Sequence, residues 1–191
     1  DASNSRANSG ESGAIIYNVA DGTSHLYIIL TDSTLSKWKV NMRISIVTGE
    51  YPPIEGGVGD FTQKLAVALC DQSHEVHILT TQQNHKSGIE KDQGGPLVYR
   101  QIQATGWPLI HTIRCWVREI SPDALNLQYQ AAAYRMRGGL NAYPWFHRDR
   151  TLPVVVTFHD LLPPYLFPKA GPLRPWSVRM LAQHADGVIA T

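Results

Sequence analysis

From Met42 onward, short apolar runs rich in β-branched residues alternate with segments of helical periodicity, and this alternation restricts the chain to few folds. The sequence predicts strands at Arg43–Thr48, Glu75–Thr80, Leu97–Ile102, Ala124–Gln128, Val154–Phe158 and Gly187–Ala190. It predicts helices at Asp60–Asp71, Pro108–Glu119, Ala131–Phe146 and Pro172–His184, the third of them broken near Gly138-Gly139 and Pro144. Strands that alternate with helices form βαβ units, and strands that are apolar along their whole length are buried on both faces. We therefore expect a Rossmann-like α/β fold, an open parallel sheet with helices on both faces.

Residues 1–41 differ in composition from the rest of the chain. Asp1–Gly13 is rich in Ser, Asn and Gly, and the two short apolar runs that follow are spaced like a loose hairpin. Met42 is the first methionine and opens the first clear strand. We expect Met42 to be the native start, with residues 1–41 a poorly defined extension (read-through, a cloning remnant or the tail of another segment) and residues 42–191 one lobe.

Charge and cysteine content exclude several classes of protein. The formal net charge is +1, so no global field favours nucleic acid. One basic cluster, made of Arg135, Arg137, Arg148 and Arg150, is expected to be a solvated face, with a peripheral contact to anionic lipid as the alternative. The two cysteines have no metal-ligand spacing, and we expect a cytoplasmic protein without a metal site.

A glycine-rich loop, Gly49–Asp60, joins the first strand to the first helix. In an open parallel sheet, ligands bind at the carboxyl ends of the strands. Glycines let the backbone approach a ligand closely, and the free N–H groups of a helix start favour an anion. The sequence thus predicts an anion site here, although a glycine-rich turn with nothing bound is the alternative.

The loop does not match three common nucleotide-binding or phosphate-accepting motifs. Gly57-Val58-Gly59 lacks the third glycine of a dinucleotide fingerprint, and the second strand ends without the acid that would bind a ribose. A P-loop needs Gly-Lys-Ser/Thr, which is absent from the loop. A response regulator needs an aspartate at the end of the third strand, and none is placed there.

A second polar strand end is Thr157-Phe158-His159-Asp160. His159 leaves the most apolar strand and is expected to project into a cleft at its mouth, where it could donate to a sugar hydroxyl or support charge on a leaving group. The alternative is a histidine that only ties down the loop. Asp160 is expected to brace that loop.

These two motifs together resemble glycosyltransferase family 4. Met42–Gln82 reads MRISIVTGEYPPIEGGVGDFTQKLAVALCDQSHEVHILTTQ, which is similar to the opening of such enzymes, with E-Y-P-P, a Gly-Gly loop and H-E-V-x-x-L-T. Pro153–Thr191, with V-V-V-T-F-H-D and A-D-G-V-I-A-T, resembles a later stretch of the same N-terminal lobe. The resemblance covers Met42 to Thr191 and implies the acceptor-binding lobe of a GT-B enzyme, with the donor-binding lobe missing.

The resemblance implies a nucleoside-diphosphate sugar as donor, no bound cofactor or metal, and transfer with retention to a saccharide or lipid-linked acceptor. It places donor phosphates at Gly56, Gly57 and Val58, and the transferred sugar at His159. Strand-mouth residues are the candidates for holding the acceptor: Glu50, Tyr51, Gln128, Tyr129 and Asp160. An exposed apolar patch is expected where the missing lobe would dock.

Two positions depart from the family pattern. Ile54 stands where some relatives carry a lysine, so electrostatic help for the phosphates would come from elsewhere. Ser73 stands where relatives often have glycine, and a left-handed turn there would be slightly strained. Two other functions stay open, a non-catalytic sugar- or nucleotide-binding module and a different GT-B-like enzyme such as a sugar-nucleotide epimerase.

Overall fold

The computed structural model describes residues 14–15, 27–29, 41–82, 88–91, 95–147, 151–160 and 173–191. Most of the predicted N-terminal extension and two arginines of the basic cluster, Arg148 and Arg150, lie outside these residues.

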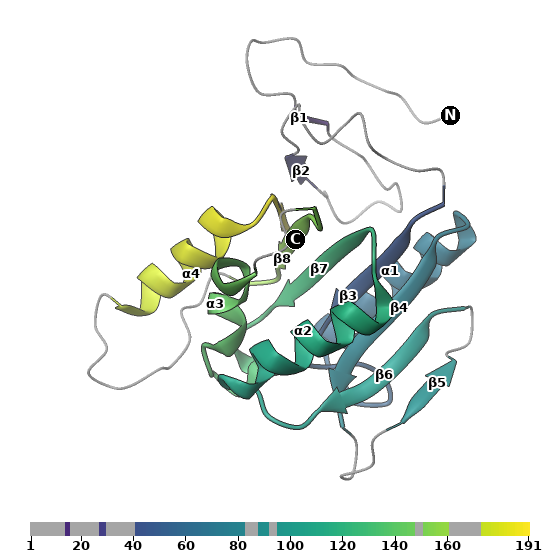
Figure 1. Ribbon diagram of the computed structural model, residues 1–191, viewed down its shortest axis with the longest axis horizontal. Coiled ribbons are helices and arrows are strands. Elements are labelled where there is room, and N and C mark those ends of the chain that lie inside the picture. Colours follow the sequence, from purple (N-terminus) through teal and green to yellow (C-terminus); the bar gives the residue numbers. More distant parts are fainter. Residues whose placement is uncertain are drawn as a thin grey trace.

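A twisted sheet with a parallel centre forms the middle of the molecule (Figure 1). Its parallel strands lie side by side in the order β9 (Gly187–Ala190), β8 (Val154–Phe158), β7 (Ala124–Tyr129), β3 (Arg43–Val47), β4 (Glu75–Thr81) and β6 (Leu97–Ile102). The predicted strands and their parallel arrangement are confirmed.

Short antiparallel strands extend both edges of the sheet, and the sequence analysis did not predict this arrangement. β5 (Ile89–Lys91) pairs with β6 at one edge. At the other edge, β2 (Tyr27–Ile29) pairs with β9, and β1 (Ala14–Ile15) pairs with β2. Strands of two or three residues carry too few side chains to show a period of two in the sequence.

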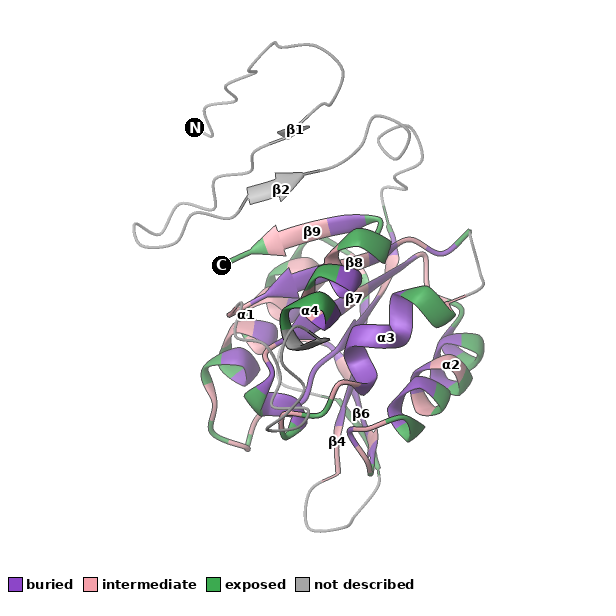
Figure 2. Cartoon of the chain, turned by 90° about the vertical axis from the view of Figure 1, so that its left-hand side faces the viewer, coloured by how far each residue is buried: buried purple, intermediate pink, exposed green. Residues whose placement is uncertain are grey.

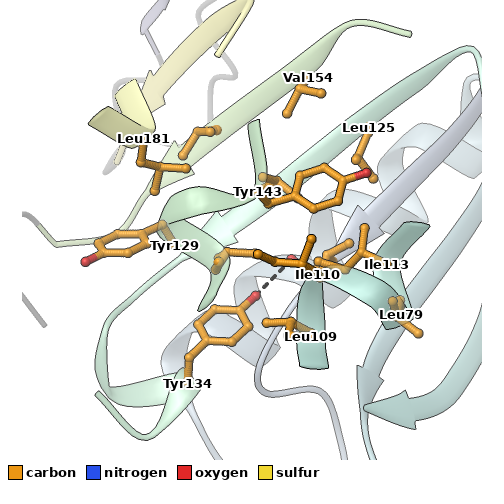
Figure 3. Close-up of a cluster of buried hydrophobic side chains, with 14 of the residues drawn as sticks. Leu79, Leu109, Ile110, Ile113, Leu125, Tyr129, Tyr134, Tyr143, Val154 and Leu181 are labelled. Carbon is orange, nitrogen blue, oxygen red and sulfur yellow. Dashed lines mark hydrogen bonds between the residues drawn. The ribbon is translucent and has the colours of Figure 1, made fainter. Parts of the chain in front are cut away.

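Helices cover both faces of the sheet, as expected. α2 (Pro108–Ile120), α3 (Gly139–Phe146) and α4 (Leu173–His184) lie on one face, and α1 (Gly57–Asp71) lies on the other (Figure 1). The larger core lies under the three helices and includes the side chains in Figure 3, such as Leu125, Tyr143 and Leu181. The smaller core lies under α1 and includes Ile46, Ile78 and Ala66.

Two helix boundaries differ from the prediction. α1 begins at Gly57, three residues before the predicted start, because Gly57-Val58-Gly59 takes helical geometry despite its two glycines. Pro144 lies inside α3 instead of breaking it. Proline lacks an N–H, but in a helix that begins at Gly139 this loss falls within the first turns, where few intrahelical bonds depend on it. The predicted break before Gly139 is confirmed by the short 3-10 helix η2 (Ala132–Tyr134), which precedes it.

Candidate functional site

The strand order places the predicted site residues at one edge of the sheet. From β3 the chain proceeds to β4 and β6 on one side, and then returns to β7 on the other side of β3. The order of the strands therefore reverses between β3 and β7, and ligands of open α/β sheets bind outside the carboxyl ends at such a point. Glu50 follows β3, Gln128 and Tyr129 end β7, and His159 follows β8.

Tyr134 joins the ends of the two strands at this point. Its hydroxyl lies 3.1 Å from the carbonyl oxygen of Gln128 and 3.3 Å from that of Val47. The ring is fully buried, and burial raises the pKa of the phenol, so Tyr134 stays neutral and serves as a hydrogen-bond donor. This tyrosine, which the sequence analysis missed, fills the switch point from the side of the larger core (Figure 3).

Glu50 and Gly56 meet at the two ends of the glycine-rich loop. A Cβ placed on Gly56 would lie 2.1 Å from Oε2 of Glu50, so only glycine leaves room for the carboxylate in this position. The Glu50 side chain is half-buried, and this burial raises the pKa of its carboxyl group. Thr48 holds the backbone here, because its hydroxyl donates to the Glu50 carbonyl at 2.8 Å.

The start of α1 presents its backbone openly. Gly56 is the N-cap with extended backbone (φ 172°) and no side-chain cap, and Gly57 is the first helical residue. A Cβ added at Gly57 would meet no atom within 4 Å, so the space beside this residue is open. The N–H groups in the first turn of a helix have no intrahelical partners. Gly56, Gly57 and the neighbouring amide of Val58 thus form a helix start to which an anion has access.

Arg100 of β6 anchors the same loop from beneath. Its side chain is 7% exposed, one terminal nitrogen donates to the carbonyl oxygen of Pro52, and Nε donates to Glu90 Oε1 at 2.5 Å. A charged group at such a buried position is stabilised by these acceptors. Arg100 was not singled out in the sequence because it lies inside an otherwise unremarkable strand.

His159 is held by two side chains at the carboxyl ends of β7 and β9. Its Nε2 lies 2.6 Å from Gln128 Oε1, and its Nδ1 lies 3.2 Å from the hydroxyl of Thr191. Burial lowers the pKa of His159, and nearby Asp160 opposes part of that shift. The imidazole is therefore neutral at pH 7.

The neighbouring amides fix which ring nitrogen of His159 carries the proton. Gln128 Nε2 donates to Asn126 Oδ1 at 2.5 Å, and Asn126 Nδ2 donates to the Thr157 hydroxyl at 3.0 Å. Gln128 therefore presents its carbonyl oxygen to His159, whose Nε2–H donates to it. Nδ1 is left as an acceptor on the more exposed side of the ring, so the site offers a hydroxyl group an acceptor instead of the donor that we expected.

Phe61 connects the two predicted motifs. It lies one turn after Gly57 on α1, and its ring packs edge-on against the His159 ring with the centroids 4.9 Å apart. The open helix start and the histidine therefore belong to one site. Neither Phe61 nor Asn126 was predicted, although polar residues at alternate positions of β7 and β8 (Asn126 and Gln128, Thr157 and His159) are a signal that could have found the polar row.

The five acceptor candidates divide by burial. Tyr51, Gln128 and Tyr129 are at most 1% exposed, so they offer little surface for direct contact with a ligand. Tyr51 belongs to the smaller core, and the Tyr129 ring packs against Phe158 at 5.2 Å. Glu50 and Asp160 are half-buried and present part of their side chains to the site.

Two further searches covered the described residues only. Among them, no three His, Cys, Asp or Glu side chains gather in a way that could hold a metal ion. In the same part of the chain, no helix has the length and apolar character needed to cross a bilayer.

The fold and the position of the site define a Rossmann-like lobe of the GT-B class. Residues 56–191 match the model of the glycosyl transferase 4-like domain, and the chain belongs to this family. The resemblance proposed from the two motifs is thereby confirmed. No curated relative matches the chain in sequence.

Solved structures support the fold. The chain is similar to sucrose-phosphate synthase from Thermosynechococcus elongatus with a TM-score of 0.53 and 14% identity, over 74% of this chain and 39% of that one. It also matches the catalytic domain of starch synthase IV from Arabidopsis thaliana, bound to ADP and acarbose, with a TM-score of 0.42 and 14% identity, over 62% and 34% of the two chains. The chain therefore spans less than half the length of either protein.

Proposed function

We propose that this chain is the acceptor-binding lobe of a sugar-nucleotide-dependent glycosyltransferase, which transfers a hexose or related sugar to a saccharide or lipid-linked acceptor. Family membership supports the reaction class. The observation that carries the assignment to this site is the contact of Phe61 with His159, which brings the open start of α1 and the histidine together beside the strand-order switch point.

The donor in this proposal is a nucleoside-diphosphate sugar. The first-turn amides at Gly56, Gly57 and Val58 bind the phosphates, since the space beside Gly57 is open and a helix start attracts negative charge. The donor's nucleotide and the rest of the sugar are held by a second lobe, which the GT-B class implies and this chain does not contain.

His159 acts on the transferred sugar as a neutral side chain. Its Nδ1 accepts a hydrogen bond from a sugar hydroxyl, which replaces the contact with Thr191, while Nε2–H stays with Gln128. A ring held in one tautomer is oriented before the substrate arrives, which favours electrostatic stabilisation of the transition state. The reaction needs no protein nucleophile or metal and proceeds with retention, the leaving phosphate taking the proton of the acceptor hydroxyl on the same face.

The acceptor lies against Glu50 and Asp160 in this arrangement. Both carboxyl groups are half-buried at the mouths of their strands and can accept from hydroxyl groups. Tyr51, Gln128 and Tyr129 lie beneath them and support the site from the core.

The test is a transfer assay on the full gene product that contains this chain, with labelled UDP-, GDP- and ADP-hexoses. His159→Ala should lower turnover at least about tenfold, or ~1.4 kcal/mol of transition-state stabilisation. Gly57→Val should weaken donor binding by about tenfold or more, because its side chain fills the space beside the amides.

Gly88→Val is the matched control, because a Cβ at this exposed glycine also meets no atom within 4 Å and the residue lies beside the edge strand β5. Full turnover of the His159 variant with unchanged donor binding would contradict the role of the histidine. Equal donor affinity for the Gly57 and Gly88 variants would show that the glycine loop is only a turn.

A further inference from the structure

Four large aromatic side chains lie exposed on the helical face opposite α1. Trp107 is 67% exposed, Trp145 58%, Trp176 53% and Phe146 40%. Among the described residues, Ile89 on β5 is the one other large apolar side chain that is exposed to this degree. The exposed apolar side chains of the described chain are thus almost entirely aromatic and gathered on α2, α3 and α4.

Ring contacts make these residues one surface. Phe146 lies with its ring centroid 6.0 Å from that of Trp107 and 5.2 Å from that of Trp145, and Trp145 lies 6.5 Å from His184. Trp176 precedes His184 on α4 by a little over two helical turns, and both are exposed. We call this set (Trp107, Trp145, Phe146, Trp176 and His184) the aromatic surface; exposed parts of α3 and α4 are green in Figure 2.

Packing of the lobe does not account for this exposure. The same helices already bury Leu140, Tyr143 and Leu181 at 0% exposure against the sheet. Exposing a large aromatic ring to water is unfavourable, by about 25 cal/mol for each Å² of apolar area. Contiguous exposed apolar patches rimmed by polar residues mark interaction sites.

The charge around the aromatic surface is positive. Arg137 is exposed and lies beside Gly106, the residue before Trp107, and Arg179 is exposed on α4 between Trp176 and His184. The sequences of α3 and α4 contain no Asp or Glu, and the first turn of α2 contains none. A chain with a formal net charge of only +1 therefore concentrates cationic groups where its exposed rings lie.

We propose that the aromatic surface docks this lobe on an anionic phospholipid bilayer. Tryptophan is enriched at the membrane–water interface, where its apolar ring meets acyl chains and its N–H stays hydrated. Arginine beside such rings binds lipid phosphate, and each cationic group near an anionic surface adds about a fivefold gain in binding. The surface carries both groups together, without acidic side chains on α3 or α4 that an anionic membrane would repel.

Vesicle flotation of the 191-residue chain tests the proposal without reference to its enzymatic activity. We expect binding to vesicles that contain phosphatidylglycerol, weaker binding to pure phosphatidylcholine, and a loss of binding as salt screens the charges. The double variant Trp107→Ser, Trp145→Ser should lose binding by at least about tenfold. Arg179→Glu should lose it by more than about fivefold, because it replaces an attractive charge with a repulsive one.

Ile89→Ser is the matched control, since Ile89 is exposed to the same degree as Trp145 but lies on the edge strand β5. Its vesicle binding should equal that of the unchanged chain. No binding to anionic vesicles, or binding that the tryptophan and arginine variants leave intact, would overturn the proposal. Concentration-dependent self-association that only the tryptophan variants abolish, without vesicle binding, would also overturn it and assign the surface to a protein contact.

Discussion

Oε1 of Gln128 lies 2.6 Å from Nε2 of His159, and the two side chains come from neighbouring parallel strands. Because Gln128 is fully buried and donates its own amide to Asn126, its oxygen has a fixed direction. The histidine is held in one tautomer, and its other ring nitrogen faces the site. Gln128 is thus a positioning residue for His159, although the sequence suggested an acceptor ligand.

Substitution of Gln128 should change the titration of His159 in a predictable direction. Gln128→Glu places a carboxyl group against Nε2 and should raise the pKa of His159 by stabilising the imidazolium. Gln128→Leu removes the acceptor, leaves Nε2–H unpaired, and should cost about 1–3 kcal/mol of stability. The histidine ring signals in NMR spectra recorded against pH report the first effect, and urea unfolding reports the second. If His159 titrates alike in all three proteins, Gln128 does not position it.

The stability of the fold should depend on pH through His159. Burial lowers its pKa in the folded state, so the unfolded chain takes up a proton first as the pH falls. Stability is therefore fully present above the unfolded value of about 6.5 and declines below it, until the folded-state pKa is reached. His159→Gln should flatten this part of the profile of urea midpoint against pH. A variant profile that still follows that of the unchanged chain would show that other groups cause the decline.

Two glycines of the same loop should respond oppositely to alanine. A Cβ at Gly49 would lie 2.3 Å from the carbonyl oxygen of Ala133, and backbone cannot move aside easily. Gly49→Ala should therefore cost about 1–3 kcal/mol. Gly57→Ala meets open space in the first turn of α1 and should keep or raise stability, by up to about 1 kcal/mol. Thermal unfolding of both variants decides this, and equal melting temperatures would contradict the close approach at Gly49.

Ser73 should be a site of stabilisation by glycine. The predicted left-handed turn is confirmed, since Ser73 has a φ of 68° and its N–H donates to the Cys70 carbonyl at 2.8 Å after the end of α1. A side chain costs about 1 kcal/mol in this conformation, so Ser73→Gly should raise the free energy of unfolding by roughly that amount.

Gln72→Gly is the control for this prediction, because Gln72 has a φ of −85° and gains nothing from a glycine. It should lower the free energy of unfolding, since glycine has more conformational freedom to lose. Equal changes in both variants would mean that the left-handed backbone at Ser73 carries no strain.

The sequence by itself determined the strands, their parallel arrangement and the helices between them, because hydrophobic period and length are local properties. It also determined which two strand ends carry polar and glycine-rich motifs, and their spacing indicated the family. The ends of α1 and α3 were less exact, since glycine and proline are tolerated near a helix start for reasons that depend on the fold.

Tertiary structure alone decided how the site is assembled. Hydrogen bonds between Gln128 and His159, the ring contact of Phe61, and the anchoring of Pro52 by Arg100 join residues that are about 30 to 100 positions apart in the chain. Burial, which turned Tyr51 and Tyr129 from ligand candidates into core residues, depends on the strands and helices that pack around each side chain. No local pattern encodes such contacts, because they form only when the strand order brings distant segments to one edge of the sheet.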